Sequence, residues 1–300
     1  MMMCITLWNA SKKLYCKINP DHFCKVKKSK SLFLVLFLVI VIVVLCFELF
    51  PTGVAQNNSA QIESNEAKAE LVSFENLELP AKLKNEQIIR HTGFTLSYNA
   101  EWLCPNWVAW ELTSSETEGV EERAKHFKPD PNVYGTKVVT KDYSNSGYDR
   151  GHMAPAADMK WSEQAMRESF YMTNICPQIH NLNAGDWKEL EELCRTWANH
   201  FGKIYICCGP IVSNNPKRIG ENGVAVPDAF FKVILAFKNK QPQSIAFLMA
   251  NKPGNKPLQT YAMSIEDMET VTGLDFFTQL PDSLEQITET DLTLKSWIWQ

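Results

Sequence analysis

Residues 146–195 concentrate side chains whose types and spacing suit the hydrolysis of a phosphodiester. One cluster is Asp149-Arg150-Gly151-His152, and a second extends from Asn174 to Arg195. Such a reaction needs an activated water, charge relief on the phosphoryl oxygens and a stabilised leaving oxygen. The imidazole, carboxylate, carboxamide and guanidinium groups of this segment are the right inventory for that chemistry with one hard metal ion.

The type of each side chain indicates a role. His152 is the candidate general base, because a neutral imidazole accepts a proton near neutral pH. Asn183 can offer an amide oxygen to Mg²⁺, or to Mn²⁺, and such an ion keeps most of its waters, so that one or two protein ligands suffice. Arg150 and Arg195 can pair with phosphate oxygens.

The spacing of these residues resembles the DNA/RNA non-specific endonuclease family, the ββα-metal or His-Me finger nucleases with a D-R-G-H motif. The resemblance extends from about Gly93 to the C-terminal region, roughly two thirds of the chain, and so many fixed positions make it specific. The positions that carry it after the D-R-G-H motif are Asn174, Pro177, Gln178, Asn183, Trp187, Leu190, Glu191 and Arg195.

This resemblance implies a metal-dependent hydrolase that cleaves DNA and RNA with little sequence preference and leaves 5′-phosphate products. It also implies that Arg123, in the segment 123–130, reaches the active site, although a plain surface charge is the alternative. Together, Arg123, Arg150 and Arg195 are expected to hold phosphate and to stabilise the transition state.

Three further residues are expected to support the site. Glu191 could hold a metal-bound water, orient Asn174 or pair with Arg195, which follows it by one helical turn. Glu191 and Asn174 are expected to support the hydrated ion. Asp149 is expected to orient Arg150 or the backbone rather than to bind metal.

Rival interpretations exist for two groups of residues. Asn183 could serve as a helix N-cap, a position that asparagine favours, and this role is compatible with metal binding. A zinc site of Cys176, His180 and Cys194 is conceivable, but no Cys-x-x-Cys pair supports it. Family nucleases often have a polar residue four positions before Asn174; here that residue is Phe170, so no role is assigned to it.

The charge distribution leaves one different class of function open. The chain has a formal net charge of -4, and residues 1–50 contain seven of its 30 basic and two of its 34 acidic residues. The remainder therefore has 23 basic and 32 acidic residues, a net charge of -9, which is unusual for a general nucleic-acid binder. The alternative function is a catalytically inactive, membrane-anchored nucleic-acid or surface binding protein on a nuclease scaffold.

The N-terminal residues have the pattern of a membrane anchor. Residues 1–30 are lysine-rich, and residues 31–50 form an apolar run long enough to span a bilayer. The lysines predict that the N-terminus stays in the cytoplasm and that the nuclease domain is exported to the periplasmic or extracellular side. The alternative is a signal peptide cleaved after Ala55, which would release a secreted protein.

The rest of the sequence predicts an α+β fold with a mainly antiparallel central sheet, flanking helices and an embedded ββα-metal motif. Residues 51–85 have the composition of a linker, except that 77–80 could begin a docking strand, and residues 86–300 are the expected nuclease domain. Strands are expected at 91–98, 107–112, 170–175, 203–212, 229–237 and 243–250, and helices at 162–170, 183–201 and 265–271.

Five cysteines follow the apolar run: Cys104, Cys176, Cys194, Cys207 and Cys208. Their spacing permits a disulfide framework without fixing one, and an odd number leaves at least one thiol unpaired. The adjacent Cys207 and Cys208 would point to opposite faces of a strand, so both could not easily join one local bridge.

Overall fold

The computed structural model describes residues 75–84 and 86–299. Its main sheet has seven strands in the order β1-β2-β3-β6-β9-β10-β11, and all neighbouring strands are antiparallel. The predicted antiparallel central sheet is therefore confirmed. The strands are β1 (Gln87–Arg90), β2 (Thr95–Asn99), β3 (Cys104–Thr113), β6 (Lys203–Ile211), β9 (Ala229–Lys238), β10 (Gln241–Ala250) and β11 (Ala262–Met263).

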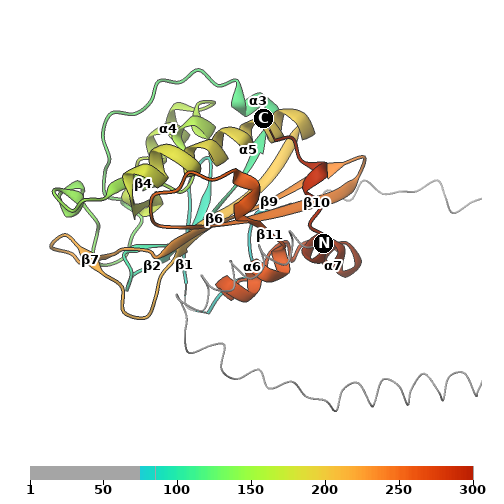
Figure 1. Ribbon diagram of the computed structural model, residues 1–300. Helices are drawn as coiled ribbons and strands as arrows, with labels where there is room; N and C mark the ends of the chain where they lie inside the picture. Colours follow the sequence, from blue (N-terminus) through green and yellow to red (C-terminus); the bar gives the residue numbers. More distant parts are fainter. Residues whose placement is uncertain (1–74, 85, 300) are drawn as a thin grey trace, which may run out of the picture. The chain divides into compact units, whose positions relative to one another are not determined.

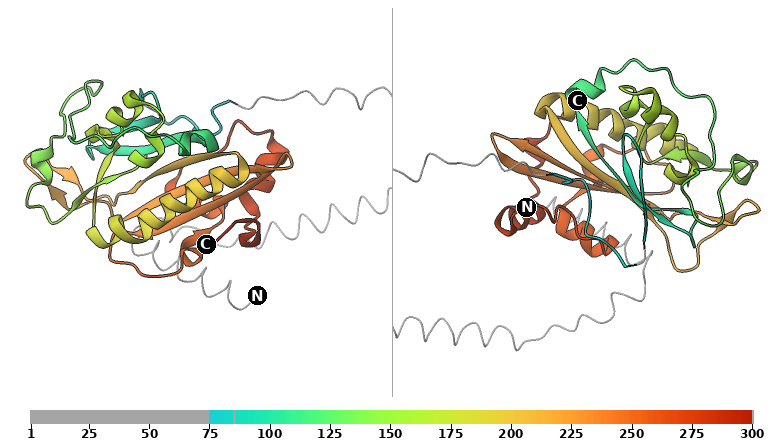
Figure 2. Two further views of the ribbon diagram at one scale, coloured as in Figure 1. Left: turned by 90° about the horizontal axis from the view of Figure 1, so that it is seen from above. Right: turned by 180° about the vertical axis from the view of Figure 1, so that it is seen from behind.

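Helices cover both faces of this sheet. Helix α5 (Trp187–Phe201) lies along one face, and α6 (Ile265–Thr272) and α7 (Asp282–Thr290) lie on the other (Figures 1 and 2). The shorter helices α3 (Ser114–Thr117) and α4 (Glu163–Glu168) are on the α5 side (Figure 1). The N-caps predicted for α4 and α6 are present: the hydroxyls of Ser162 and Ser264 accept hydrogen bonds from the amides of Ala165 and Asp267.

The central strands are apolar on both sides because each face is covered. On β9, Phe230 and Ile234 belong to the core beneath α5, which we call the α5-side core, whereas Phe231 and Val233 belong to the α6-side core. This alternation is the period of two that a strand imposes on its side chains. Between two helical layers it produces a continuous run of hydrophobic residues in the sequence.

A separate two-stranded ribbon carries the D-R-G-H motif. Strand β4 (Asp149–His152) pairs antiparallel with β5 (Ile175–Gln178), and α5 follows in the chain, which gives the β-β-α order that the sequence predicts. The predicted strand 170–175 is displaced, because residues 172–174 form a 3-10 turn and β5 begins at Ile175. Pro177 does not end the strand but lies within it, which a ribbon with two free edges tolerates.

The first predicted strand is in fact a hairpin. The sequence predicts one strand over 91–98, but residues 91–94 form a turn, closed by a hydrogen bond of 2.8 Å from the amide of His91 to the carbonyl of Phe94. Strand β1 precedes this turn and pairs with β2. The alternation of apolar and polar residues continues through the turn, so that periodicity alone does not reveal the reversal.

The folded unit begins upstream of residue 86, within the predicted linker. Leu77 is fully buried in the α6-side core, where Leu79 and Leu83 pack against it. The amide of Ala81 donates a hydrogen bond of 2.7 Å to the carbonyl of Asp275. The predicted docking segment therefore packs on the domain, although it adds no strand to the sheet.

The described cysteines form no disulfides. All five are free and buried, and Cys207 and Cys208 lie on opposite faces of β6, in the α6-side and α5-side cores respectively. The predicted basic segment 1–30 and membrane segment 31–50 are outside the described residues. Within the described ranges, no helix has the length and hydrophobicity needed to cross a bilayer.

Candidate active site

His152 is buried among aromatic side chains. Its ring packs against those of Phe127 and Phe170, with centroids 5.4 and 4.9 Å away, and these two rings are themselves 4.9 Å apart. The residue is 8% exposed. Atom Nε2 is buried with no hydrogen-bond partner among the described residues. Burial and, to a lesser degree, the charge of Arg123 lower the pKa of His152 to about 3. The imidazole is therefore neutral at physiological pH, as a general base requires.

Two arginines pack on the aromatic rings that contact this histidine. The guanidinium of Arg123 lies 4.9 Å from the ring centroid of Phe170, and that of Arg150 lies 4.9 Å from the ring centroid of Phe127. Both arginines are exposed, and neither has an ion pair with another described residue. The two rings that enclose His152 thus also hold two cations whose hydrogen-bond donors are free for phosphate oxygens.

Gly151 is required by the close packing of the ribbon. A Cβ atom at this position would lie 2.0 Å from Oε1 of Gln178, a fully buried residue. No side chain fits there unless Gln178 moves, which explains why the position before His152 is glycine.

Asp149 holds Asn183, whereas the sequence predicts that it orients Arg150 or the backbone. Its Oδ2 atom accepts hydrogen bonds from Nδ2 of Asn183 at 2.9 Å and from Nδ1 of His180 at 2.8 Å. Because the amide nitrogen of Asn183 faces Asp149, its Oδ1 atom is directed elsewhere, and it makes no hydrogen bond to a described residue. Asn183, Asp149, Arg150 and Phe127 line an open hollow of about 450 Å³.

Asn183 does not cap α5. It lies in a π-helical turn, Leu182–Asp186, that precedes the helix, and Gly185 in this turn has the non-helical angles φ -110° and ψ -116°. The α-helix starts at Trp187 rather than at the predicted residue 183. The kink places Asn183 beside β4 instead of in line with the helix.

Asn174 braces the loop after His152. Its Nδ2 atom donates to the carbonyls of Ala154 and Ser169 at 2.8 and 2.9 Å, and its Oδ1 atom accepts from the amide of Ala154 at 2.9 Å. The residue is fully buried. Both amide hydrogens bond to backbone carbonyls, so Asn174 holds the loop that follows His152 in place.

Arg195 pairs with Asp158 and not with Glu191. Its Nη1 atom lies 2.9 Å from Oδ1 of Asp158, and Nε1 of Trp110 donates to Oδ2 at 3.2 Å. Burial raises the pKa of Asp158, and the neighbouring Arg195 opposes this rise. The carboxylate fixes one side of the guanidinium and leaves its other N–H groups available.

Glu191 has no hydrogen bond or ion pair with another described residue. Burial raises its pKa to about 7, while Lys232 and Arg195 act in the opposite direction and Asp158 adds to the rise. Other residues fill two of the three roles expected from the sequence. Asp158 pairs with Arg195, and the backbone of Ala154 and Ser169 orients Asn174. A contact with a metal-bound water is the role that remains for this carboxylate.

A buried lysine lies beneath these groups. Lys232 is 0% exposed and its Nζ atom has no hydrogen-bond partner among the described residues. The ammonium group lies 4.5 Å from the ring centroid of Trp187 and 5.4 Å from that of Trp110. Trp187 in turn donates from Nε1 to the carbonyl of His152 at 3.4 Å. The cation thus lies between two tryptophans, one bonded to the backbone of His152 and the other to Asp158.

The donor set fits a hard divalent cation. Oδ1 of Asn183 and the carboxylate of Glu191 are oxygen donors without protein partners, and Mg²⁺ and Mn²⁺ prefer oxygen ligands and retained waters. The imagined zinc site is not assembled: the one described cluster of three potential metal-binding groups is Glu269, Asp275 and Glu289, which does not include Cys176 or Cys194.

Sequence reasoning missed several residues that shape this site. Phe127 and Phe170 enclose His152, Asp158 holds Arg195, and Asn251 joins β5 to the end of β10 through hydrogen bonds to the backbone of Pro177 and Ile179. Only Lys232 carries a signal in the sequence, since a lysine interrupts the apolar run of β9. The others are recognisable only from their three-dimensional neighbours.

Comparisons with known proteins agree with this geometry. The model of the DNA/RNA non-specific endonuclease family matches residues 73–283. Mitochondrial nuclease EXOG of Danio rerio is 39% identical over 207 residues, which cover 63% of this chain and 60% of that protein. Human mitochondrial endonuclease G is 33% identical over 205 residues, 63% of this chain and 69% of the relative. The chain thus spans about 60% of the first of these relatives.

A nuclease of the cyanobacterium Nostoc and a solved structure extend the comparison. The Nostoc protein is 32% identical over 219 residues, which cover 69% of this chain and 79% of that protein. The crystal structure of the EndoG/EndoGI complex, described as showing the mechanism of EndoG inhibition, contains a chain with a TM-score of 0.64 and 27% identity. The match covers 69% of this chain and 90% of the solved one.

These comparisons correct the predicted localisation. The sequence predicts export of the nuclease domain to a periplasmic or extracellular side, or secretion. The relatives EXOG from fish and human, at 39% and 37% identity, and human endonuclease G are all named as mitochondrial proteins. The prediction of an exported domain is therefore wrong. It rested on the lysines of residues 1–30 and on the rule that such lysines mark the cytoplasmic side of a membrane protein.

Proposed function

Because this chain belongs to the DNA/RNA non-specific endonuclease family, we propose that it hydrolyses phosphodiester bonds of DNA and RNA. The observation that carries the proposal is the buried His152, whose two aromatic neighbours each hold an exposed arginine that has no ion pair among the described residues. A neutral base and two cations at one place can deprotonate a water and neutralise a phosphate. The relatives named as nucleases support the same reaction.

In the proposed mechanism, His152 takes a proton from the attacking water. Arg123 and Arg150 bind the non-bridging phosphate oxygens, and Arg195, held by Asp158, adds positive charge as the pentavalent transition state forms. None of these groups reads a base edge, which agrees with cleavage that has little sequence preference. We expect products with 5′-phosphate ends.

Asn183 and Glu191 are the residues that would hold Mg²⁺ or Mn²⁺. When bound, such an ion supplies Lewis-acid stabilisation of the leaving oxygen. Asp149 orients the carboxamide so that Oδ1, and not Nδ2, is offered to a cation. Glu191 would accept hydrogen bonds from the waters of that ion.

The names of the relatives favour mitochondria as the location of this protein. The charge-based alternative, a binding protein without catalysis, has less support, because the residues proposed as base, metal ligand and phosphate-binding groups are all present in the sequence. Microscopy of the tagged full-length chain against a mitochondrial marker tests the location.

The test of the function is the nicking of closed circular plasmid and the degradation of an RNA transcript in Mg²⁺, with and without EDTA. We expect cleavage of both substrates, no cleavage with EDTA, and a loss of about 10²–10⁴-fold in His152→Ala, the usual effect of removing a positioned general base. A folded His152→Ala protein with wild-type rates would refute the mechanism. Tight binding of nucleic acid without cleavage by the wild type would instead establish the binding-protein alternative.

A further inference from the structure

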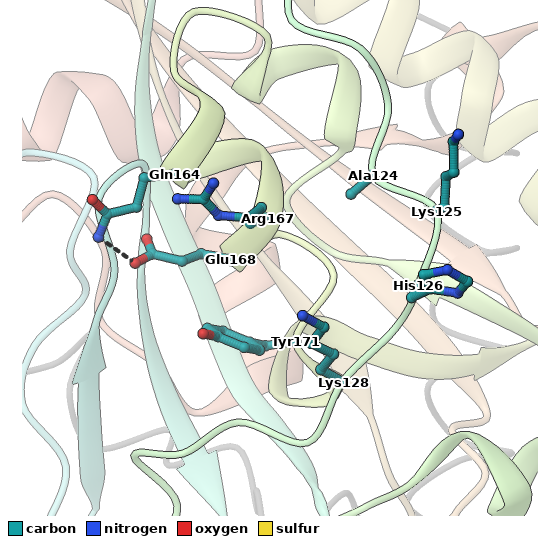
Figure 3. Close-up of a pocket in the computed structure, with 8 residues that line it drawn as sticks. All are labelled: Ala124, Lys125, His126, Lys128, Gln164, Arg167, Glu168 and Tyr171. Atoms are coloured by element: carbon teal, nitrogen blue, oxygen red, sulfur yellow. Dashed lines mark hydrogen bonds between the residues drawn. The ribbon is translucent and has the colours of Figure 1, made fainter.

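A second hollow lies beside the active site, between the segment 124–128 and α4. It has a volume of about 690 Å³, and Figure 3 shows the side chains that surround it. Lys128 and Tyr171 lie next to each other on one side, and Arg167 projects from α4 on the other; Lys125 lies at the edge and extends away from α4 (Figure 3). We call this hollow the basic groove; its lining residues are Ala124, Lys125, His126, Lys128, Gln164, Arg167, Glu168 and Tyr171.

The cations of the basic groove are free to bind a ligand. Lys125 and Lys128 are exposed and have no ion pair among the described residues, and Arg167 has one with Glu163, in which both side chains are more than half exposed. Such a surface pair is weak and easily exchanged. The groove is thus locally positive, in contrast with the net charge of -9 for residues 51–300.

The one acidic residue of the groove is occupied. Glu168 accepts hydrogen bonds from the amide of Thr92 at 2.6 Å and from Nε2 of Gln164 at 2.9 Å, one on each carboxylate oxygen. Its carboxylate therefore anchors α4 to the β1–β2 turn. Because both carboxylate oxygens of Glu168 already accept hydrogen bonds from the protein, this residue repels an anionic ligand less than a carboxylate without such bonds would.

The groove and the active site share two backbone segments. The amide of Lys128 donates to the carbonyl of Phe170 at 3.1 Å, and the amide of Met172 donates to the carbonyl of Lys128 at 2.9 Å. Between these bonds, Lys128 and Tyr171 form a parallel β-bridge. The neighbouring residues Phe127 and Phe170 contact His152, so the same two segments form the wall of the active site and the floor of the groove.

We propose that the basic groove binds the nucleic-acid strand next to the phosphate that is cleaved, with Lys128 and Arg167 pairing with backbone phosphates and Tyr171 stacking on a base. The proposal rests on the proposed nuclease function. Free cations beside an aromatic ring are the combination that binds single strands without regard to sequence, because every nucleotide has a phosphate and a π-face. The ring of Tyr171 lines the groove, and it also contacts that of His91 at a centroid distance of 5.3 Å.

The test compares a long and a short substrate in the full-length protein. Lys128→Gln/Arg167→Gln removes two groove cations, and Lys238→Gln/Lys240→Gln removes two exposed cations at the β9–β10 turn, away from the groove (Figure 1). For a 20-nucleotide DNA strand, we expect KM to rise roughly tenfold or more in the groove variant, with kcat unchanged. The slope of log KM against log salt should become shallower by about 1.4, because two phosphate contacts on a single strand are lost. For a dinucleotide, which has a single phosphodiester, we expect unchanged kcat/KM.

A second pair of variants tests the aromatic contribution on the same two substrates. Tyr171→Phe retains the ring and should behave as wild type, whereas Tyr171→Leu should raise KM for the 20-mer by roughly fivefold or more. The dinucleotide should again be cleaved at the wild-type rate.

The outcomes separate this proposal from the proposed function. If the wild type cleaves the 20-mer and the groove variant has the same KM and salt slope, the groove does not bind the strand. Equal losses on both substrates would also overturn the proposal, because the groove would then support the catalytic centre. Equal effects of the groove and β9–β10 variants would show general charge attraction instead. Failure of the wild type to cleave either substrate would refute the nuclease function itself.

Discussion

The two faces of the central sheet differ in what they bury. The α5-side core is interrupted by fully or nearly fully buried polar groups, among them Asn174, Gln178, Asp158 and Lys232. The α6-side core is mainly apolar, with side chains such as Phe231, Leu248 and Phe276, and its buried polar groups among the described residues include only uncharged hydroxyls such as that of Ser244, which donates to the carbonyl of Thr288. Unpaired buried polar groups destabilise a fold, so one face carries the chemistry and the other supplies the stability that permits it. The difference can be tested by changing one face at a time.

The largest effect should follow from Asn183, on the α5 side. Asn183→Ala removes an expected metal ligand and should lower the cleavage rate by about 10²-fold or more, with little change in the free energy of unfolding. Asn183→Asp places a second carboxylate opposite Asp149; it should bind Mg²⁺ as well or better and yet cleave more slowly, because the added charge repels phosphate. Rate against Mg²⁺ concentration, with calorimetric Mg²⁺ titration, checks both variants. Unchanged metal dependence in Asn183→Ala would remove Asn183 from the metal site.

Phe276 provides the opposite case on the α6 side. It is 1% exposed and lies 5.8 Å from the ring centroid of Phe231. Phe276→Ala should lower the free energy of unfolding by about 3–5 kcal/mol, measured by urea denaturation, while kcat of the folded protein stays at the wild-type value. A tenfold loss of kcat in the folded variant would contradict the separation of the two faces.

These contrasts show what the sequence could predict. The D-R-G-H ribbon, the α5 helix and the central strands follow from local patterns, because motif spacing and strand periodicity are properties of neighbouring residues. The position of Asn183 did not follow, because Gly185 breaks the helix in a π-turn that helical periodicity does not reveal. Asp158 and Phe127 were missed because their roles arise from contacts with residues 37 and 25 positions away in the chain.

Lys232 sharpens the comparison, because it is a cation within an otherwise apolar strand. Lys232→Met keeps the length of the side chain and removes the charge next to Glu191 and Asp158. We expect kcat to fall roughly tenfold with KM unchanged, because those carboxylates lose a neighbouring cation, whereas the free energy of unfolding should stay the same or rise. Steady-state kinetics and urea denaturation measure the two quantities. A large loss of stability with normal kcat would make Lys232 a structural residue only.

The smallest effect concerns pH. With His152 neutral because burial lowers its pKa to about 3, the group that titrates near neutrality is Glu191, whose pKa burial raises to about 7. Its ionised form is the active one, so the rate should fall as the pH decreases through about 7. Glu191→Gln should be slower, but with a rate that is flat between pH 5 and pH 8. The pH profile of kcat/KM for both proteins is the measurement, and an unchanged profile in Glu191→Gln would assign the titration elsewhere.

The free cysteines have a consequence for where this domain can fold. Burial raises the pKa of the Cys194 and Cys208 thiols to about 12 and raises that of Cys176 and Cys207 as well. A thiol is nucleophilic and oxidisable mainly as the thiolate, so these four are chemically quiet in the native state. Because none of the five forms a bridge, the described domain reaches its native state without an oxidant. Its folding therefore depends on no disulfide-forming machinery in the compartment that receives it.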